Sequence, residues 1–194
     1  MAEEKGPQWA MATPAVVYLV GVACIGIWAL LAGIGDVTPN AIPIIAAILI
    51  ACGIPTMILG AIELRRGDIL FGSINMVFGG LIWFGLGFMF MTVVYFGLPE
   101  LNVIAFFLFG ISLLFVLFLY PVSKASKFVM VAFVVLAVGL ALMGADLYDG
   151  IPKFGEGIMA ISGYCFLIFG LMVIYAGTVF ITNTVCQAPK LWLK

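Results

Sequence analysis

Continuous apolar runs, each about long enough to cross a bilayer, constrain the fold of this chain more than any other feature. Charged residues, Pro and Gly divide the 194-residue sequence into six such runs, at about 14–35, 41–64, 69–97, 102–121, 127–145 and 155–186. The strands of a membrane barrel would instead alternate apolar and polar residues over short segments. The sequence therefore predicts an all-α integral membrane protein, a bundle of six transmembrane helices.

Composition supports this prediction, because only 9% of the residues are charged and 65% are hydrophobic. A soluble domain has about 25% charged residues, and so few charges could not make a water-exposed surface. The breaks between the runs are short, which predicts one compact transmembrane domain at 14–186 between tails at 1–13 and 187–194. The acidic start does not resemble a cleaved signal, so we expect the first apolar run to be retained.

The basic residues predict the orientation of the bundle. If the six runs cross the membrane in turn, all but one of the Lys and Arg residues fall on the same side, and the exception is Lys153. Basic residues accumulate on the cytoplasmic side of membrane proteins. We therefore expect a multi-pass protein of the cytoplasmic (inner or plasma) membrane with both termini in the cytoplasm. The basic side consists of Lys5, Arg65, Arg66, Lys124, Lys127, Lys190 and Lys194, and the opposite, acidic side carries Asp36, Glu100, Asp146, Asp149 and Glu156.

The stretch "ELRRGD", residues 63–68, concentrates four charges between two apolar runs. It predicts a tight cytoplasmic turn in which the arginines anchor the topology. Glu63 has two interpretations. It could be an interfacial carboxylate that pairs with Arg66, three positions later on the same helix face, or it could have a structural or functional role at the mouth of a pore.

The apolar runs offer little catalytic chemistry. The chain has no His, which is the usual proton shuttle and the commonest metal ligand. Buried carboxylates or lysines, which serve as relays in ion-coupled transporters, are nearly missing from the runs. We therefore expect no enzymatic activity, no cofactor, no metal site and no nucleic-acid partner. The four cysteines are expected to be small buried hydrophobes: Cys24, Cys52, Cys165 and Cys186.

Neutral polar residues within the runs could bind a small solute or could link helices to one another. The candidates for lining a pore are Tyr18, Ser73, Asn75 and Tyr175. Asn75 is the strongest of them, because an amide is costly in lipid unless it has a partner. Large apolar side chains such as Phe78 could form a hydrophobic constriction.

The stretch from Cys52 to Trp83, "CGIPTMILGAIELRRGDILFGSINMVFGGLIW", resembles the acetate uptake transporter family, which includes bacterial succinate–acetate permeases. The resemblance is carried by Gly60, Glu63, Gly67 and Trp83 in that stretch, by Thr13, Pro14 and Ala15 at the first helix, and by Tyr175 and Asn183 in the last run. It extends over nearly the whole chain.

The resemblance implies six helices, a pore in each protomer and a homo-oligomer, a homohexamer in the bacterial members. It implies a small monocarboxylate as the solute, acetate or in some cases succinate, which passes a narrow apolar waist. The corresponding waist positions are Val22, Phe78 or Gly79, and Val134. The expected function is thus a passive or weakly proton-linked channel for small carboxylic acids.

Two alternatives stay open at this point. The acidic outer side would suit a neutral or cationic solute such as urea, an amide or ammonia better than an anion. Abundant glycine and the near lack of buried charge would equally suit a membrane scaffold that transports nothing.

Overall fold

The computed structural model describes residues 12–34, 41–96, 101–150 and 153–186. The expected C-terminal tail at 187–194 and residues 1–11 of the expected N-terminal tail at 1–13 lie outside these ranges, and residues 12 and 13 belong to the first helix. Six helical segments follow one another in the described residues, and no strand is found among them. The elements are α1 (Ala12–Leu31), α2 (Ile42–Arg65), α3 (Ile69–Val77), the π-helix η3 (Phe78–Gly85), α4 (Leu86–Phe96), α5 (Leu101–Ala125), α6 (Lys127–Tyr148) and α7 (Gly157–Cys186). Because α3, η3 and α4 are continuous, they form the single segment predicted at 69–97.

Five of the six segments are long and apolar enough to cross a membrane: α2, the segment at 69–92, α5, α6 and α7. The described apolar part of α1, Val16–Leu31, is shorter. The predicted all-α membrane architecture is therefore confirmed, and a sixth crossing by α1 stays a prediction. Many large apolar side chains point outward, as expected of helices that face lipid rather than water.

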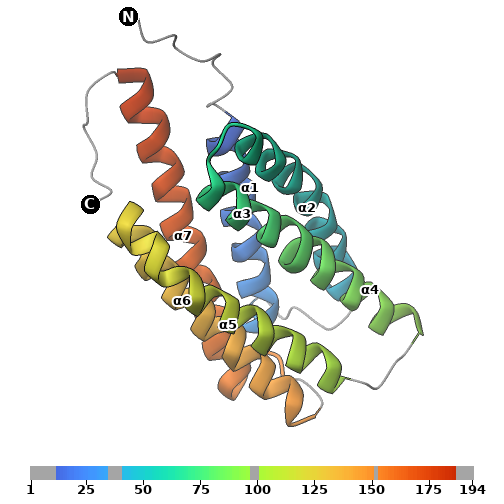
Figure 1. Ribbon diagram of the computed structural model, residues 1–194. Helices are drawn as coiled ribbons and strands as arrows, with labels where there is room; N and C mark the ends of the chain where they lie inside the picture. Colours follow the sequence, from blue (N-terminus) through green and yellow to red (C-terminus); the bar gives the residue numbers. More distant parts are fainter. Residues whose placement is uncertain (1–11, 35–40, 97–100, 151–152, 187–194) are drawn as a thin grey trace, which may run out of the picture.

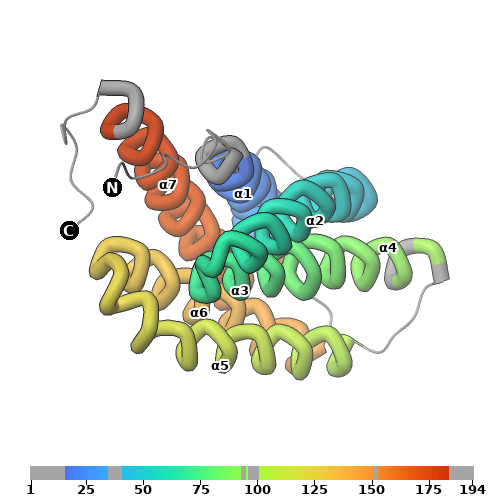
Figure 2. The backbone as a smooth tube through the Cα atoms, turned by 45° about the horizontal axis from the view of Figure 1, so that its top comes forward, coloured from blue at the N-terminus to red at the C-terminus, as the bar shows by residue number. Residues whose placement is uncertain are grey.

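The six segments form a ring. Figures 1 and 2 show α1 between α7 and α2, the α3–η3–α4 segment against α2, and α5 paired with α6, which in turn packs against α7. The side chain of Phe107 on α5 lies 3.4 Å from the position that a Cβ at Gly85 would occupy, which closes the ring between η3 and α5. The core lies inside this ring.

The turn between α2 and α3 is built from the residues that the sequence singled out. Gly67 adopts a positive φ of 85°, a conformation that side-chain-bearing residues rarely take. Asp68 then caps α3, because its carboxylate accepts a hydrogen bond from the backbone N–H of Phe71 at 3.0 Å. The predicted tight turn at 63–68 is therefore confirmed, and it brings α3 back along α2.

Glycine allows α2 and the 69–96 segment to approach closely. A Cβ at Gly60 would lie 2.8 Å from the backbone nitrogen of Met76, and one at Gly79 would lie 2.6 Å from that of Met57. Within this contact the helix widens into η3. Such π-helical stretches are rare and often occur at functional sites. The widened turn carries Phe78 and Trp83, both buried.

Candidate functional site

A cavity of about 350 Å³ opens at one end of the ring. The first turns of α1, the turn between α2 and α3, the start of α6 and the end of α7 surround it, so these four ends lie together. Its wall is predominantly apolar, with two carboxylates and one amide. The lining residues are Val16, Val17, Val20, Glu63, Asp68, Phe71, Ile74, Asn75, Phe78, Phe128, Val129, Ala132, Phe133, Phe169, Met172, Val173, Ala176 and Phe180.

Glu63 and Asn75 form the polar part of the cavity wall. The side-chain amide of Asn75 donates a hydrogen bond of 2.6 Å to Oε2 of Glu63, and it joins the end of α2 to α3. Glu63 is only 8% exposed, so the amide stabilises a carboxylate that has lost most of its contact with water. The side chain of Glu63 lines the cavity, and its role at the mouth of a pore stays a prediction.

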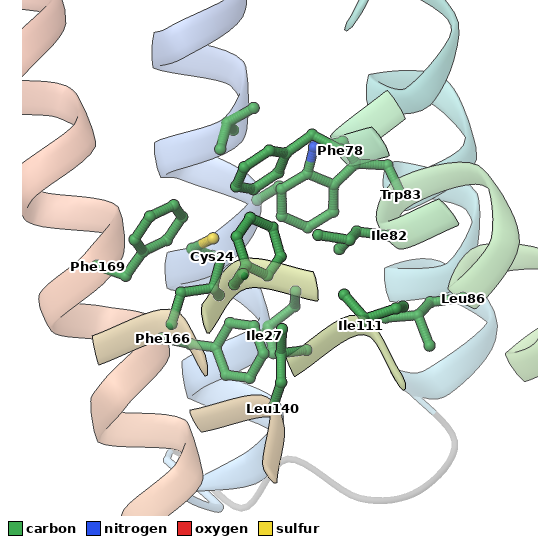
Figure 3. Close-up of a cluster of buried hydrophobic side chains, with 14 of the residues drawn as sticks. Cys24, Ile27, Phe78, Ile82, Trp83, Leu86, Ile111, Leu140, Phe166 and Phe169 are labelled. Carbon is green, nitrogen blue, oxygen red and sulfur yellow. The ribbon is translucent and has the colours of Figure 1, made fainter. Parts of the chain in front are cut away.

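Four phenylalanine rings pack together at the cavity, and three of them, those of Phe78, Phe133 and Phe169, line it (Figure 3 shows this region). The ring of Phe78 stacks on that of Phe169 with centroids 5.9 Å apart, and it lies 5.0 Å from the ring of Phe115 and 5.9 Å from that of Phe133. All four side chains are at most 5% exposed. They come from η3, α5, α6 and α7, so one layer of aromatic rings joins four of the six segments. We call this layer the phenylalanine floor.

Beyond the phenylalanine floor the interior is packed with apolar side chains. Figure 3 shows Cys24, Ile82 and Phe166 in this layer, and all three are at most 1% exposed. A second cavity, of about 60 Å³, lies nearer the opposite end, and its lining residues, among them Ile27, are entirely apolar. The two cavities share no lining residue, and buried apolar side chains pack between them.

Two of the expected waist positions lie elsewhere. Val22 is 62% exposed and Val134 is 41% exposed, and neither lines a cavity. A side chain on the outer surface of the ring cannot narrow a path within it, so both expectations need correction. Gly79 faces α2 instead of the cavity, since its nearest neighbours are Met57 and Gly53. Of the expected constriction residues, only Phe78 lies at the cavity floor.

Only one of the four residues expected to line a pore lines the cavity. Asn75 lines the cavity, whereas Tyr18, Ser73 and Tyr175 are not among its lining residues. The Tyr18 hydroxyl is hydrogen-bonded to Oγ1 of Thr178 at 2.8 Å and thereby links α1 to α7. The Tyr175 ring lies 5.4 Å from that of Phe128 and is 40% exposed.

Two serines show the same linking role. Ser112 on α5 donates to the Ala137 carbonyl of α6 at 2.8 Å, and Ser162 on α7 donates to the Gly139 carbonyl of α6 at 2.7 Å. These bonds satisfy buried hydroxyls and tie α5 and α7 to α6. For Tyr18, Ser112 and Ser162, the interpretation as links between helices is therefore the one that the structure supports.

The residues that carried the family resemblance serve mainly the packing of the ring. Gly60 permits the close approach of α2 and α3, Gly67 makes the turn, and Trp83 is fully buried beside Phe78. Asn183 lies near the end of α7 and is not among the residues that line the cavity. The backbone of Thr13, Pro14 and Ala15 begins α1, and their side chains lie outside the described residues.

The sequence did not reveal the other three members of the phenylalanine floor, Phe115, Phe133 and Phe169. Phenylalanine is frequent here, with 17 in the chain, and one buried ring cannot be told from one that faces lipid within a uniformly apolar helix. The π-helix was missed for a similar reason. Its glycines at 79, 80 and 85 were visible, but glycine in a membrane helix usually signals close packing.

No protein-family model and no curated protein matches the chain. Among solved structures, the bacterial acetate channel SatP is similar, with a TM-score of 0.81 over 94% of this chain and 98% of that one, at 19% sequence identity. Identity at this level shows a shared fold and leaves the solute open. The resemblance predicted from the sequence is thus confirmed at the level of the fold, and this chain has the fold of SatP.

Proposed function

We propose that this chain is a membrane channel or facilitator for small monocarboxylates, acetate being the simplest. One observation carries the proposal: in a chain with the fold of an acetate channel, a cavity enters the helix ring and ends at a layer of four phenylalanine rings. Six crossings, cytoplasmic termini, a solute path within each protomer and a homo-oligomer, hexameric by resemblance, belong to the same proposal. Transport is passive or weakly proton-linked.

The chemistry of the cavity favours entry of the neutral acid. Glu63 and Asp68 both line it, and both carboxylates repel an anionic carboxylate, most strongly Glu63, which is buried in a low dielectric. Acetic acid carries no charge, can hydrogen-bond to Glu63 or Asn75, and can place its methyl group against the apolar wall. Protein-dependent flux should therefore increase as the pH falls, because the neutral fraction of the solute grows.

The phenylalanine floor supplies the barrier. A solute that reaches Phe78 meets a ring that packs against four other aromatic rings, so passage requires this layer to move. Constrictions made of apolar side chains gate other channels by excluding water. Phe78 lies at the start of η3, and a rearrangement of the widened turn would displace it. This is the step that we expect to limit flux.

A small neutral or cationic solute, such as urea or ammonia, is the second candidate. The two carboxylates in the cavity favour it, since they attract cations and do not repel neutral molecules. A scaffold without transport activity receives less support, because a solid core would suit that role and a cavity of about 350 Å³ enters this one.

The experiment is uptake of radiolabelled acetate into proteoliposomes that contain the purified protein, with protein-free liposomes run beside them to measure leak through lipid. Unlabelled formate, succinate and urea serve as competitors. Protein-dependent uptake that formate reduces and urea does not would support a monocarboxylate channel. If acetate uptake does not exceed the leak while urea or ammonia shows protein-dependent flux, the monocarboxylate channel is refuted and the second candidate is supported.

A further inference from the structure

Trp83 carries a polar group that the fold does not use. The side chain is fully buried, and its indole Nε1 has no hydrogen-bond partner among the described residues. Leaving a buried donor unpaired costs free energy that an apolar side chain would not cost. Most buried polar groups in proteins are paired, so an unpaired one calls for a specific explanation.

The unpaired indole N–H of Trp83 lies close to a residue that lines the cavity. The indole ring lies 6.0 Å from the ring of Phe78, centroid to centroid, and both residues belong to η3. Figure 3 shows the indole nitrogen on the edge of the ring beside Phe78. Phe78 lines the cavity and Trp83 does not. The N–H therefore lies beside a residue whose ring lines the cavity.

We infer that the indole N–H of Trp83 donates a hydrogen bond to a carboxyl oxygen of the solute once the ring of Phe78 has moved aside. This inference rests on the proposed function and names a residue that sets its specificity. On leaving the cavity, the solute loses the polar contacts of Glu63 and Asn75 and enters a layer of apolar side chains. Trp83 offers it a polar partner at that point.

The chemistry of the donor also discriminates among solutes. A carboxyl group has oxygens that accept a hydrogen bond, and so does an amide. Ammonium has only donors and would leave the indole N–H unpaired. Trp83 thus opposes the attraction that Glu63 and Asp68 exert on cations, and it favours solutes that carry a carbonyl or carboxyl oxygen.

The test replaces Trp83 by benzothienylalanine, in which sulfur takes the place of the indole N–H while the bicyclic shape is kept. Trp28 provides the matched control, because its Nε1 is also buried and unpaired, but its ring packs against Tyr164, which lines neither cavity, and not against Phe78. The replacement at 83 should lower protein-dependent acetate flux by roughly three- to tenfold, the range of one neutral hydrogen bond, and the replacement at 28 should leave it unchanged. Circular dichroism and thermal unfolding of both variants establish that the fold is kept.

A second measurement detects the contact itself. In protein labelled with ¹⁵N at the indole nitrogens, acetate should shift the Trp83 N–H proton resonance downfield and should leave that of Trp28 in place. Two results would overturn this inference alone, provided that the unmodified protein transports acetate. One is an unchanged acetate flux through the variant replaced at position 83, and the other is a Trp83 resonance that acetate does not shift. No protein-dependent acetate flux in the unmodified protein would overturn the proposed function and this inference with it.

Discussion

Replacing Phe78 by Ala should open the floor of the cavity. Phe78 is 4% exposed and pairs with four aromatic rings, those of Trp83, Phe115, Phe133 and Phe169. An aromatic pair contributes about 1 kcal/mol beyond the area that it buries. If a passing solute must break only one of these pairs, removing that pair lowers the barrier by about 1 kcal/mol and speeds passage by about fivefold. We therefore expect at least about a fivefold increase in protein-dependent acetate flux, together with entry of longer acids such as butyrate.

The same substitution carries a stability cost that can be estimated. Removing the ring leaves a void on the order of 100 Å³, and at about 24 cal/mol per Å³ the loss is about 2 kcal/mol. This cost comes from lost packing, because lipid is as apolar as the protein interior. The midpoint of thermal unfolding in detergent should fall accordingly while the protein stays monodisperse.

Phe88→Ala is the matched control, because Phe88 lies in the same continuous helical segment and is 51% exposed. It should change neither flux nor size selectivity. Initial rates of labelled acetate and butyrate uptake into proteoliposomes, corrected for leak through protein-free lipid, provide the measurement. If folded Phe78→Ala protein transports both acids at the rates of the unmodified protein, Phe78 does not close the path and the reasoning is refuted.

Two further predictions concern stability. Asn75→Leu should lower the midpoint of thermal unfolding more than Glu63→Gln does. The first substitution leaves a buried carboxylate without its amide donor, a loss of about 1–3 kcal/mol, whereas the second removes the charge. Equal shifts would contradict the role given to the hydrogen bond between Asn75 and Glu63. Gly79→Ala should destabilise strongly, since its Cβ would lie 2.6 Å from the backbone nitrogen of Met57, whereas Gly80→Ala meets only a sulfur atom at 3.7 Å and should be tolerated. Similar unfolding midpoints for the two glycine variants would show that α2 and η3 can separate at little cost.

The helices were predictable because each is a long apolar run with a clear break at both ends. The run at 41–64 corresponds to α2, Ile42–Arg65, and the break at 63–68 to the turn that Gly67 and Asp68 make. These features depend on residues adjacent in sequence. The sequence alone is therefore enough to predict them.

The site was only partly predictable. Glu63 and Asn75 could be singled out because a carboxylate and an amide are costly beside lipid, but their hydrogen bond to each other required the folded turn. Val22 and Val134 were placed at the waist by a distant resemblance, and a uniformly apolar helix offers no polar face to correct such a placement. The phenylalanine floor joins residues 78, 115, 133 and 169, which only the closed ring of helices brings together.

The central claim is that the solute passes through the cavity within one protomer. Two valines of α1 test it most directly, because Val20 lines the cavity and is 6% exposed, whereas Val22 lies outside it and is 62% exposed. Leak-corrected acetate flux is measured for Val20→Phe and Val22→Phe, with the unfolding midpoint of each as a check on the fold. The account predicts that phenylalanine at position 20 obstructs the cavity and lowers flux severalfold while phenylalanine at position 22 leaves it unchanged. Equal flux in the two folded variants, or a loss confined to position 22, would contradict a path through this cavity.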